Sequence, residues 1–414
     1  MKYTAFLCGA FASRQSYQPG GNWKHVSLSE QERSMAGNFY YPEFVAFNYG
    51  PSANSITRYV REIKKQVSVN VGFAQNARQI DVSVVDLSFY NAPFGLCMFS
   101  VRVNIIADAN DITAVTSTLR NLNFIASGNS DFAVLAFEPI LEIYRKYALN
   151  GNENSSYPSL VEFGNKLKVF QIAVVDEDNW EEESSDNLLF EMGTLSPVGS
   201  CGSNSANASS GSYISKVMED GKVSVFNNWK ALSLFDTFTM LGNRIPDSIV
   251  DNWVANYFGM LYISELYVKF YLFRLNNDFR LNYKSADKLL EQFDEFDYSC
   301  WFDNVSYNFL PRLIHRSMEK GLDITAEKQR LYEMMARQNE NREKRDDQRM
   351  NNLLFYLTLF TTFSMVWDAS SLFNEMYPFE TYIGSDITGF RLVSYTLLLV
   401  VMIMILIVKF RKNK

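Results

Sequence analysis

The side chains that most often bind metal ions or act as nucleophiles are scarce in this sequence. A zinc site or a histidine-based triad needs several histidines or cysteines close together. The cysteines are far apart and show no CxxC spacing, which is typical of free thiols in a reducing cytosol. The sequence therefore predicts a protein that is not an enzyme, and it identifies no catalytic residue, cofactor ligand or metal ligand. The residues in question are His25, His315, Cys8, Cys97, Cys201 and Cys300.

Candidates for binding an anionic ligand are basic residues beside aromatic ones. A phosphate-bearing nucleotide needs Lys or Arg, backbone amides and a surface for stacking. Arg58, Arg61 and the segment from Arg145 to Tyr147 offer this chemistry, although isolated basic residues can equally serve only as a solvated surface. P-loop and Rossmann glycine patterns are absent, so ATP hydrolysis is not expected. The net charge of -7 argues against a general nucleic-acid-binding surface.

Hydroxyl side chains form a stripe within the apolar stretch LLFYLTLFTTFSMVWD, residues 353–368. At about 100° per residue, one side of a helix carries Asn351, Thr358, Thr362 and Met365, with Thr361 at its edge. Large apolar residues occupy the other side. This pattern predicts a first transmembrane helix whose polar side lines a pore. Alternatively, the threonines bond carbonyl groups of their own helix or pack against a neighbouring helix.

A second apolar run follows at residues 392–408 and carries no charge, which predicts a second transmembrane helix. The basic tail, residues 409–414, is then expected in the cytosol. The loop between the two helices, residues 369–391, is acidic and expected on the other side of the membrane. Asp368 would place negative charge at the outer mouth of the pore and attract cations.

The preceding residues are expected to form a cytosolic α+β domain, residues 1–245, which we interpret as a ligand sensor. Its apolar runs are rich in β-branched and aromatic residues, and the NAPFG segment from Asn91 to Gly95 predicts a turn between antiparallel strands. The first residues resemble a signal peptide, but a β-strand is the preferred interpretation.

Helices are predicted in a cytosolic region, residues 246–320, and in a charged stalk, residues 321–352. Glu265 and Lys269 are expected to pair with each other, four residues apart, on a soluble helix. In the stalk, Arg337, Glu340 and Lys344 continue the line of the pore face. They are either a gate that forms pairs between subunits or part of a solvated surface.

Together, a cytosolic α/β domain, a charged helix leading into the first of two C-terminal spans, an acidic loop and a basic tail resemble the CorA-type channel family. The Gly-Met-Asn motif of that family is absent, since the corresponding segment reads SMVWDASSLFNEMYPFE. The chain is more similar to the CorA-like membrane effectors of type III CRISPR systems. This resemblance implies a homo-oligomer, by analogy a pentamer, in the bacterial inner membrane with both termini cytosolic.

The resemblance further implies an antiviral ion channel that opens when its cytosolic domain binds a nucleotide second messenger. The messenger would be a cyclic oligoadenylate or an adenylated S-adenosylmethionine (SAM-AMP), and divalent cations are further possible ligands. Two alternatives stay open. One is a constitutive divalent-cation (Mg²⁺) transporter, and the other is a membrane-tethered sensor or scaffold without conductance.

Overall fold

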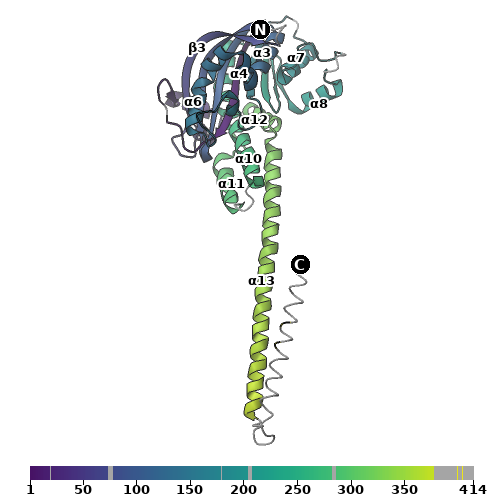
Figure 1. The fold of residues 1–414 in the computed structure, drawn as a ribbon. Coiled ribbons are helices and arrows are strands. Elements are labelled where there is room, and N and C mark those ends of the chain that lie inside the picture. The colour runs from purple at the N-terminus through teal and green to yellow at the C-terminus, as the bar shows by residue number, and fades with distance from the viewer. Residues whose placement is uncertain are drawn as a thin grey trace. The chain divides into compact units, whose positions relative to one another are not determined.

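A computed structural model describes residues 1–18, 20–72, 78–178, 180–203, 208–281, 286–376, 399 and 403. The chain divides into two compact units, Met1–Met334 and Met335–Lys414. The first unit contains a mixed β-sheet and most of the described helices (Figure 1).

The described strands form one nine-stranded sheet in the order β2-β3-β4-β5-β1-β6-β9-β8-β7. All neighbouring pairs are antiparallel except β6 and β9, which are parallel. The strands are β1 (Lys2–Ala12), β2 (Lys24–Val26), β3 (Thr57–Val71), β4 (Arg78–Ala92), β5 (Leu96–Ile106), β6 (Lys168–Val175), β7 (Lys222–Phe226), β8 (Trp229–Ser233) and β9 (Thr237–Asn243).

Two predictions about local structure are confirmed. The first residues form β1, the central strand of the sheet, which pairs with both β5 and β6. The predicted turn after Asn91 joins β4 to the antiparallel strand β5. In this turn Phe94 has a φ of 57°, so a non-glycine residue adopts the left-handed conformation there.

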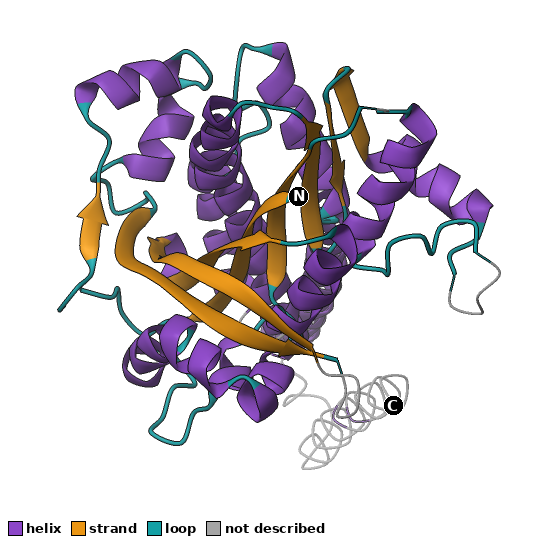
Figure 2. Cartoon of the chain, turned by 90° about the horizontal axis from the view of Figure 1, so that it is seen from above, coloured by secondary structure: helices purple, strands orange, loops and turns teal. Residues whose placement is uncertain are grey.

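Helices cover both faces of the sheet (Figure 2). They are α1 (Glu30–Gly37), α2 (Pro42–Tyr49), α3 (Ala109–Leu119), α4 (Leu122–Gly128), α5 (Ser130–Ala136), α6 (Glu138–Tyr147), α7 (Glu182–Thr194), α8 (Gly211–Gly221), α9 (Asp247–Asn252), α10 (Ile263–Leu281), α11 (Ala286–Cys300), α12 (Phe309–Gly321) and α13 (Ile324–Met376). Two short 3₁₀ helices are η1 (Pro93–Gly95) and η2 (Tyr157–Leu160), and η3 (Trp253–Tyr262) is a π-helix.

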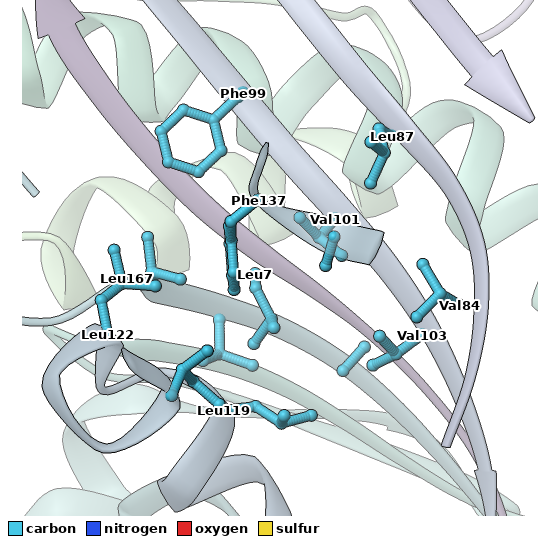
Figure 3. Close-up of a cluster of buried hydrophobic side chains, with 14 of the residues drawn as sticks. Leu7, Val84, Leu87, Phe99, Val101, Val103, Leu119, Leu122, Phe137 and Leu167 are labelled. Atoms are coloured by element: carbon cyan, nitrogen blue, oxygen red, sulfur yellow. The ribbon is translucent and has the colours of Figure 1, made fainter. Parts of the chain in front are cut away.

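Strand β1 shows why two layers of helices are needed. Its residues are buried almost continuously from Ala5 to Ala12, as expected for a strand covered on both faces. Leu7 belongs to a cluster with Leu119 and Phe137 from the layer that contains α3 to α6 (Figure 3). On the opposite face, the ring of Phe6 stacks on Phe258 of η3 with centroids 3.6 Å apart.

Helix α10 is buried nearly all round, from Ile263 to Leu272. The predicted pair between Glu265 and Lys269 is wrong. Glu265 instead lies 2.9 Å from His315 of α12, and Lys269 lies 3.2 Å from Glu327 of α13. The two side chains pair with different partners because burial demands a compensating group for each charge.

The predicted first transmembrane helix, residues 353–368, lies within α13, a helix of 53 residues. Across the residues that the structure describes, no helix combines the length and the apolar character needed to cross a membrane. The apolar stretch covers only about 24 Å, whereas the hydrocarbon core of a bilayer is about 30 Å thick. Hydroxyl groups further interrupt it, and the helix before it is highly charged.

This finding contradicts the predicted fold of two C-terminal transmembrane helices. The same finding contradicts the predicted channel, its transporter and membrane-tethered alternatives, and the inner-membrane location, because no helix in the described part of the chain provides a span. Part of the predicted acidic loop, up to Met376, is helical. Residues 377–391, the predicted second span and the basic tail lie outside the described residues, apart from Leu399 and Ile403.

The close approach of β1 to β5 gives a first prediction. A Cβ atom on Gly9 would overlap the ring of Phe99 and lie 3.0 Å from Leu167 Cδ2. Gly9→Ala should therefore lower the free energy of unfolding of the full chain by about 1–3 kcal/mol, as overpacking does. Urea denaturation followed by tryptophan fluorescence measures this change. Gly37→Ala is the control, since nothing lies within 4 Å of that position, and an equal loss in both variants would contradict the argument.

A second prediction concerns the buried pair of Lys269 and Glu327. Glu327→Gln leaves a buried ammonium group uncompensated and should cost about 3–5 kcal/mol of unfolding free energy. The control is Glu340→Gln, which breaks the exposed pair of Glu340 and Lys344 and should leave the denaturation midpoint unchanged.

The free energy of unfolding of the same Glu327→Gln variant should depend on pH. Burial already lowers the pKa of Lys269, so between that lowered pKa and the ordinary lysine pKa of the unfolded chain, the unfolded chain binds more protons than the folded chain. The stability of the variant should therefore rise with pH in the alkaline range, relative to wild type. A loss of stability independent of pH would contradict this account.

Candidate functional site

A cavity of about 760 Å³ lies in the first unit, at the end of β3 and β4 and beside α3 and α4. Its size falls within the range of pockets that hold small molecules. The labelled elements β3, α3, α4 and α7 can be followed in Figure 1. The lining residues come from segments far apart in the sequence: Asn70, Val71, Gly72, Arg78, Asn110, Thr113, Ala114, Ser117, Thr118, Phe124, Ser127, Gly128, Asn129, Leu195 and Pro197.

The wall next to β3 is fixed by two asparagines. The carboxamide of Asn129, between α4 and α5, accepts from the backbone N–H of Asn70 at 2.7 Å and donates to its carbonyl at 3.3 Å. Asn70 in turn donates its side-chain amide to the carbonyl of Gly128 at 3.1 Å. Asn129 is buried, so these bonds are protected from water. They hold the junction of α4 and α5 against the end of the strand without any ligand.

Two further contacts join other parts of the lining to α3. Asn110 Oδ1 accepts from the backbone N–H of Val198 at 2.8 Å, which ties the segment after α7 to the start of α3. Arg78 at the start of β4 lies 2.6 Å from Asp111 of α3. These contacts fix the described parts of the pocket wall.

Among the described residues, the lining presents acceptors, one cation and one aromatic ring. The hydroxyl groups of Thr113, Thr118 and Ser127 donate to carbonyls of their own helices, at 3.0, 3.0 and 3.3 Å. Their oxygen atoms can still accept hydrogen bonds from a ligand. Phe124 is 44% exposed, and the side chain of Arg78 is 53% exposed although one of its nitrogens contacts Asp111.

The basic residues singled out from the sequence lie elsewhere. Arg58 donates to Ser88 at 3.0 Å and lies over the ring of Tyr90 within the sheet. Arg145 bonds Glu138 and the carbonyl of Ser155. Arg61 is a partly exposed residue in the middle of β3 and does not line the cavity. The sequence did not indicate Arg78 as a binding residue. It lies beside α3 only because the strands β3 and β4 end there.

The predicted pore residues lie on α13. Thr358 and Thr362 donate to the carbonyls of Leu354 and Thr358 at 2.7 Å, and Thr361 donates to the carbonyl of Thr358 at 3.0 Å. These bonds are the alternative that the sequence left open, in which the hydroxyl protons satisfy the helix itself. The remaining members of the set, Asn351, Met365 and Asp368, are exposed.

The predicted gate residues are also on the surface of α13. Glu340 and Lys344 form an exposed pair at 2.6 Å, one helical turn apart. Arg337 is exposed. A pair within one helix is an ordinary feature of a solvated helix surface.

A second group of residues could hold a metal ion. Ligand atoms of Glu265, His315 and Glu319 lie within 4.8 Å of one another. Burial, followed by the charge of Glu265, raises the pKa of Glu319 to about 7. Burial alone would lower the pKa of His315, but the carboxylates of Glu265 and Glu319 outweigh it and raise that pKa. Counting histidines in the sequence missed this group, because two of its three members are glutamates.

Comparisons with protein-family models, with curated proteins and with solved structures find no match. The resemblance to CorA-like effectors, and the pentamer that it implies, therefore stay predictions. The candidate function depends on the geometry of the site alone.

Proposed function

We propose that the first unit, Met1–Met334, binds a nucleotide-class small molecule in the cavity between the end of β3 and helices α3 and α4. The protein is then a ligand-binding protein in which this unit is the sensor. The observation that carries the proposal is a cavity of about 760 Å³ whose polar walls are already fixed by hydrogen bonds between separate elements.

The groups around the cavity complement the parts of a nucleotide. A base packs against apolar or aromatic side chains, and Phe124 is the aromatic residue among the described residues that line the cavity. Amino groups on the base edge need acceptors, which the oxygens of Thr118 and Ser127 supply. A phosphate needs a guanidinium group, and Arg78 retains donors beyond the nitrogen that contacts Asp111.

The charge balance favours a ligand with few phosphates. Arg78 is the one cationic side chain among the described residues that line the cavity, and Asp111 neutralises part of its charge. A cyclic oligoadenylate carries one phosphate per nucleotide and would need several cations. An adenylated S-adenosylmethionine carries a single phosphate together with cationic groups, so it fits the pair of Arg78 and Asp111 better.

A third prediction tests this proposal by calorimetry on the full chain, with AMP, S-adenosylmethionine, its adenylated form and cyclic oligoadenylates as probes. Arg78→Ala should weaken binding of phosphate-bearing probes about tenfold to a hundredfold, as the loss of a charged hydrogen bond does. It should leave S-adenosylmethionine, which lacks phosphate, nearly unaffected. Phe124→Ala should weaken every adenine-containing probe by at least about fivefold.

Arg61→Ala is the matched control, because Arg61 lies on β3 outside the cavity. It should bind every probe with wild-type affinity. The proposal is wrong if none of the probes binds at millimolar concentration. It is also wrong if Arg61→Ala weakens binding as much as Arg78→Ala does.

A further inference from the structure

Three potential metal ligands meet where side chains of α10 and α12 approach each other. Both helices are labelled in Figure 1. Glu265 comes from α10, and His315 and Glu319 come from α12. Glu265 and His315 are 5% and 3% exposed, and Glu319 is partly buried. The group is therefore an interior feature of the first unit and lies outside the proposed nucleotide pocket.

The sequence of α12 places its two members on one face. His315 and Glu319 are four residues apart, so they lie one above the other on the helix. Ile314 and Met318, both fully buried, flank them and fix the orientation of α12. Glu265 approaches from a helix that is buried nearly all round. Each of the three side chains is thus held by the packing of its own helix.

The spacings suit a metal ion. One ligand atom from each of Glu265, His315 and Glu319 lies within 4.8 Å of the other two. Zinc binds imidazole nitrogen and carboxylate oxygen at about 2.0–2.2 Å, so two donors on one ion lie about 3–4 Å apart. Glu265 Oε1 is 2.9 Å from Nε2 of His315 and Glu319 Oε2 is 3.9 Å from Nδ1, so one carboxylate has to turn toward the other ring nitrogen for all three residues to bind one ion.

The local charge also favours a cation. Two carboxylates share this interior site, and Asp303 adds further negative charge near Glu319. Lys328 adds positive charge near Glu319, but its ammonium group is 2.8 Å from Asp297 and lies over the ring of Trp301. Arg316 also faces the group, but it is exposed. Buried carboxylates either pair with cationic groups or coordinate metal ions.

We propose that Glu265, His315 and Glu319 bind a divalent first-row transition-metal ion, with Zn²⁺ as the first choice, and that the ion fastens α12 to α10. One imidazole and two carboxylates are donors that Zn²⁺ and Mn²⁺ accept, whereas Mg²⁺ prefers oxygen alone. The competing interpretation is a histidine held between two carboxylates by hydrogen bonding, with no metal affinity.

A fourth prediction separates the two. Untagged full-length protein is stripped with a chelator and titrated with Zn²⁺, with metal content measured by mass spectrometry and stability by thermal unfolding. Wild type should retain one equivalent of Zn²⁺ after dialysis and unfold at a higher temperature with Zn²⁺ than without, because an ion that binds only the folded state stabilises it.

His25→Ala is the matched control, since His25 is the only other histidine of the chain and lies exposed on β2. It should behave as wild type. Glu319→Gln keeps the size of the side chain and should lower Zn²⁺ affinity at least tenfold and abolish the thermal shift. His315→Ala should also lower Zn²⁺ affinity and abolish the thermal shift if this variant folds. If it does not fold, the result for Glu319→Gln tests the proposal. Wild type without bound Zn²⁺, or undiminished binding by Glu319→Gln, would overturn the proposal.

Discussion

The burial of charged side chains on α10 constrains much of the first unit. Glu265 and Lys269 are 5% and 3% exposed, and a charge in such a position is tolerated only beside a compensating group. For Glu265 that group is on α12, and for Lys269 it is a glutamate 58 residues later on α13. The packing of these helices therefore follows from pairing requirements as well as from apolar contact. The candidate metal group, with two carboxylates around one imidazole, belongs to the same arrangement.

Local sequence signals predicted part of the fold. The alternation of β-branched and aromatic residues around NAPFG was enough for the β4–β5 pair, because strand propensity and turn chemistry act over a few residues. The same local logic failed for Glu265 and Lys269. Four residues apart on a helix, they matched the pattern of an exposed ion pair, but the helix is buried and each found a distant partner. Only the tertiary packing, which one sequence does not display, distinguishes the two outcomes.

The hydroxyl stripe of α13 shows a similar ambiguity. Thr358, Thr361 and Thr362 do share a side of one helix, but their hydroxyl protons bond the helix backbone. Hydroxyl groups that bond the carbonyls of their own helix have the same spacing as hydroxyl groups that face water. The spacing therefore could not distinguish a pore lining from an ordinary helix. The cavity was invisible for the opposite reason. Its lining residues run from Asn70 to Pro197 and have no common spacing, because separate loops and helix ends bring them together.

A series of charged contacts connects the helix beside this cavity to the start of α13. Arg120, at the C-terminal cap of α3, lies 2.6 Å from Asp236, which lies 2.7 Å from Lys168. The ammonium groups of Lys168 and Lys269 lie over the ring of Phe235, 3.7 and 4.7 Å from its centroid. Lys269 then contacts Glu327 of α13. Four charged residues of this series are buried: Arg120, Lys168, Lys269 and Glu327. Burial lowers the pKa of both lysines. Displacing any one of these buried charges would leave its partner uncompensated, which is costly in free energy. The contacts therefore fasten the end of α3 and the buried lysines of β6 and α10 to one another and to Glu327 at the start of α13.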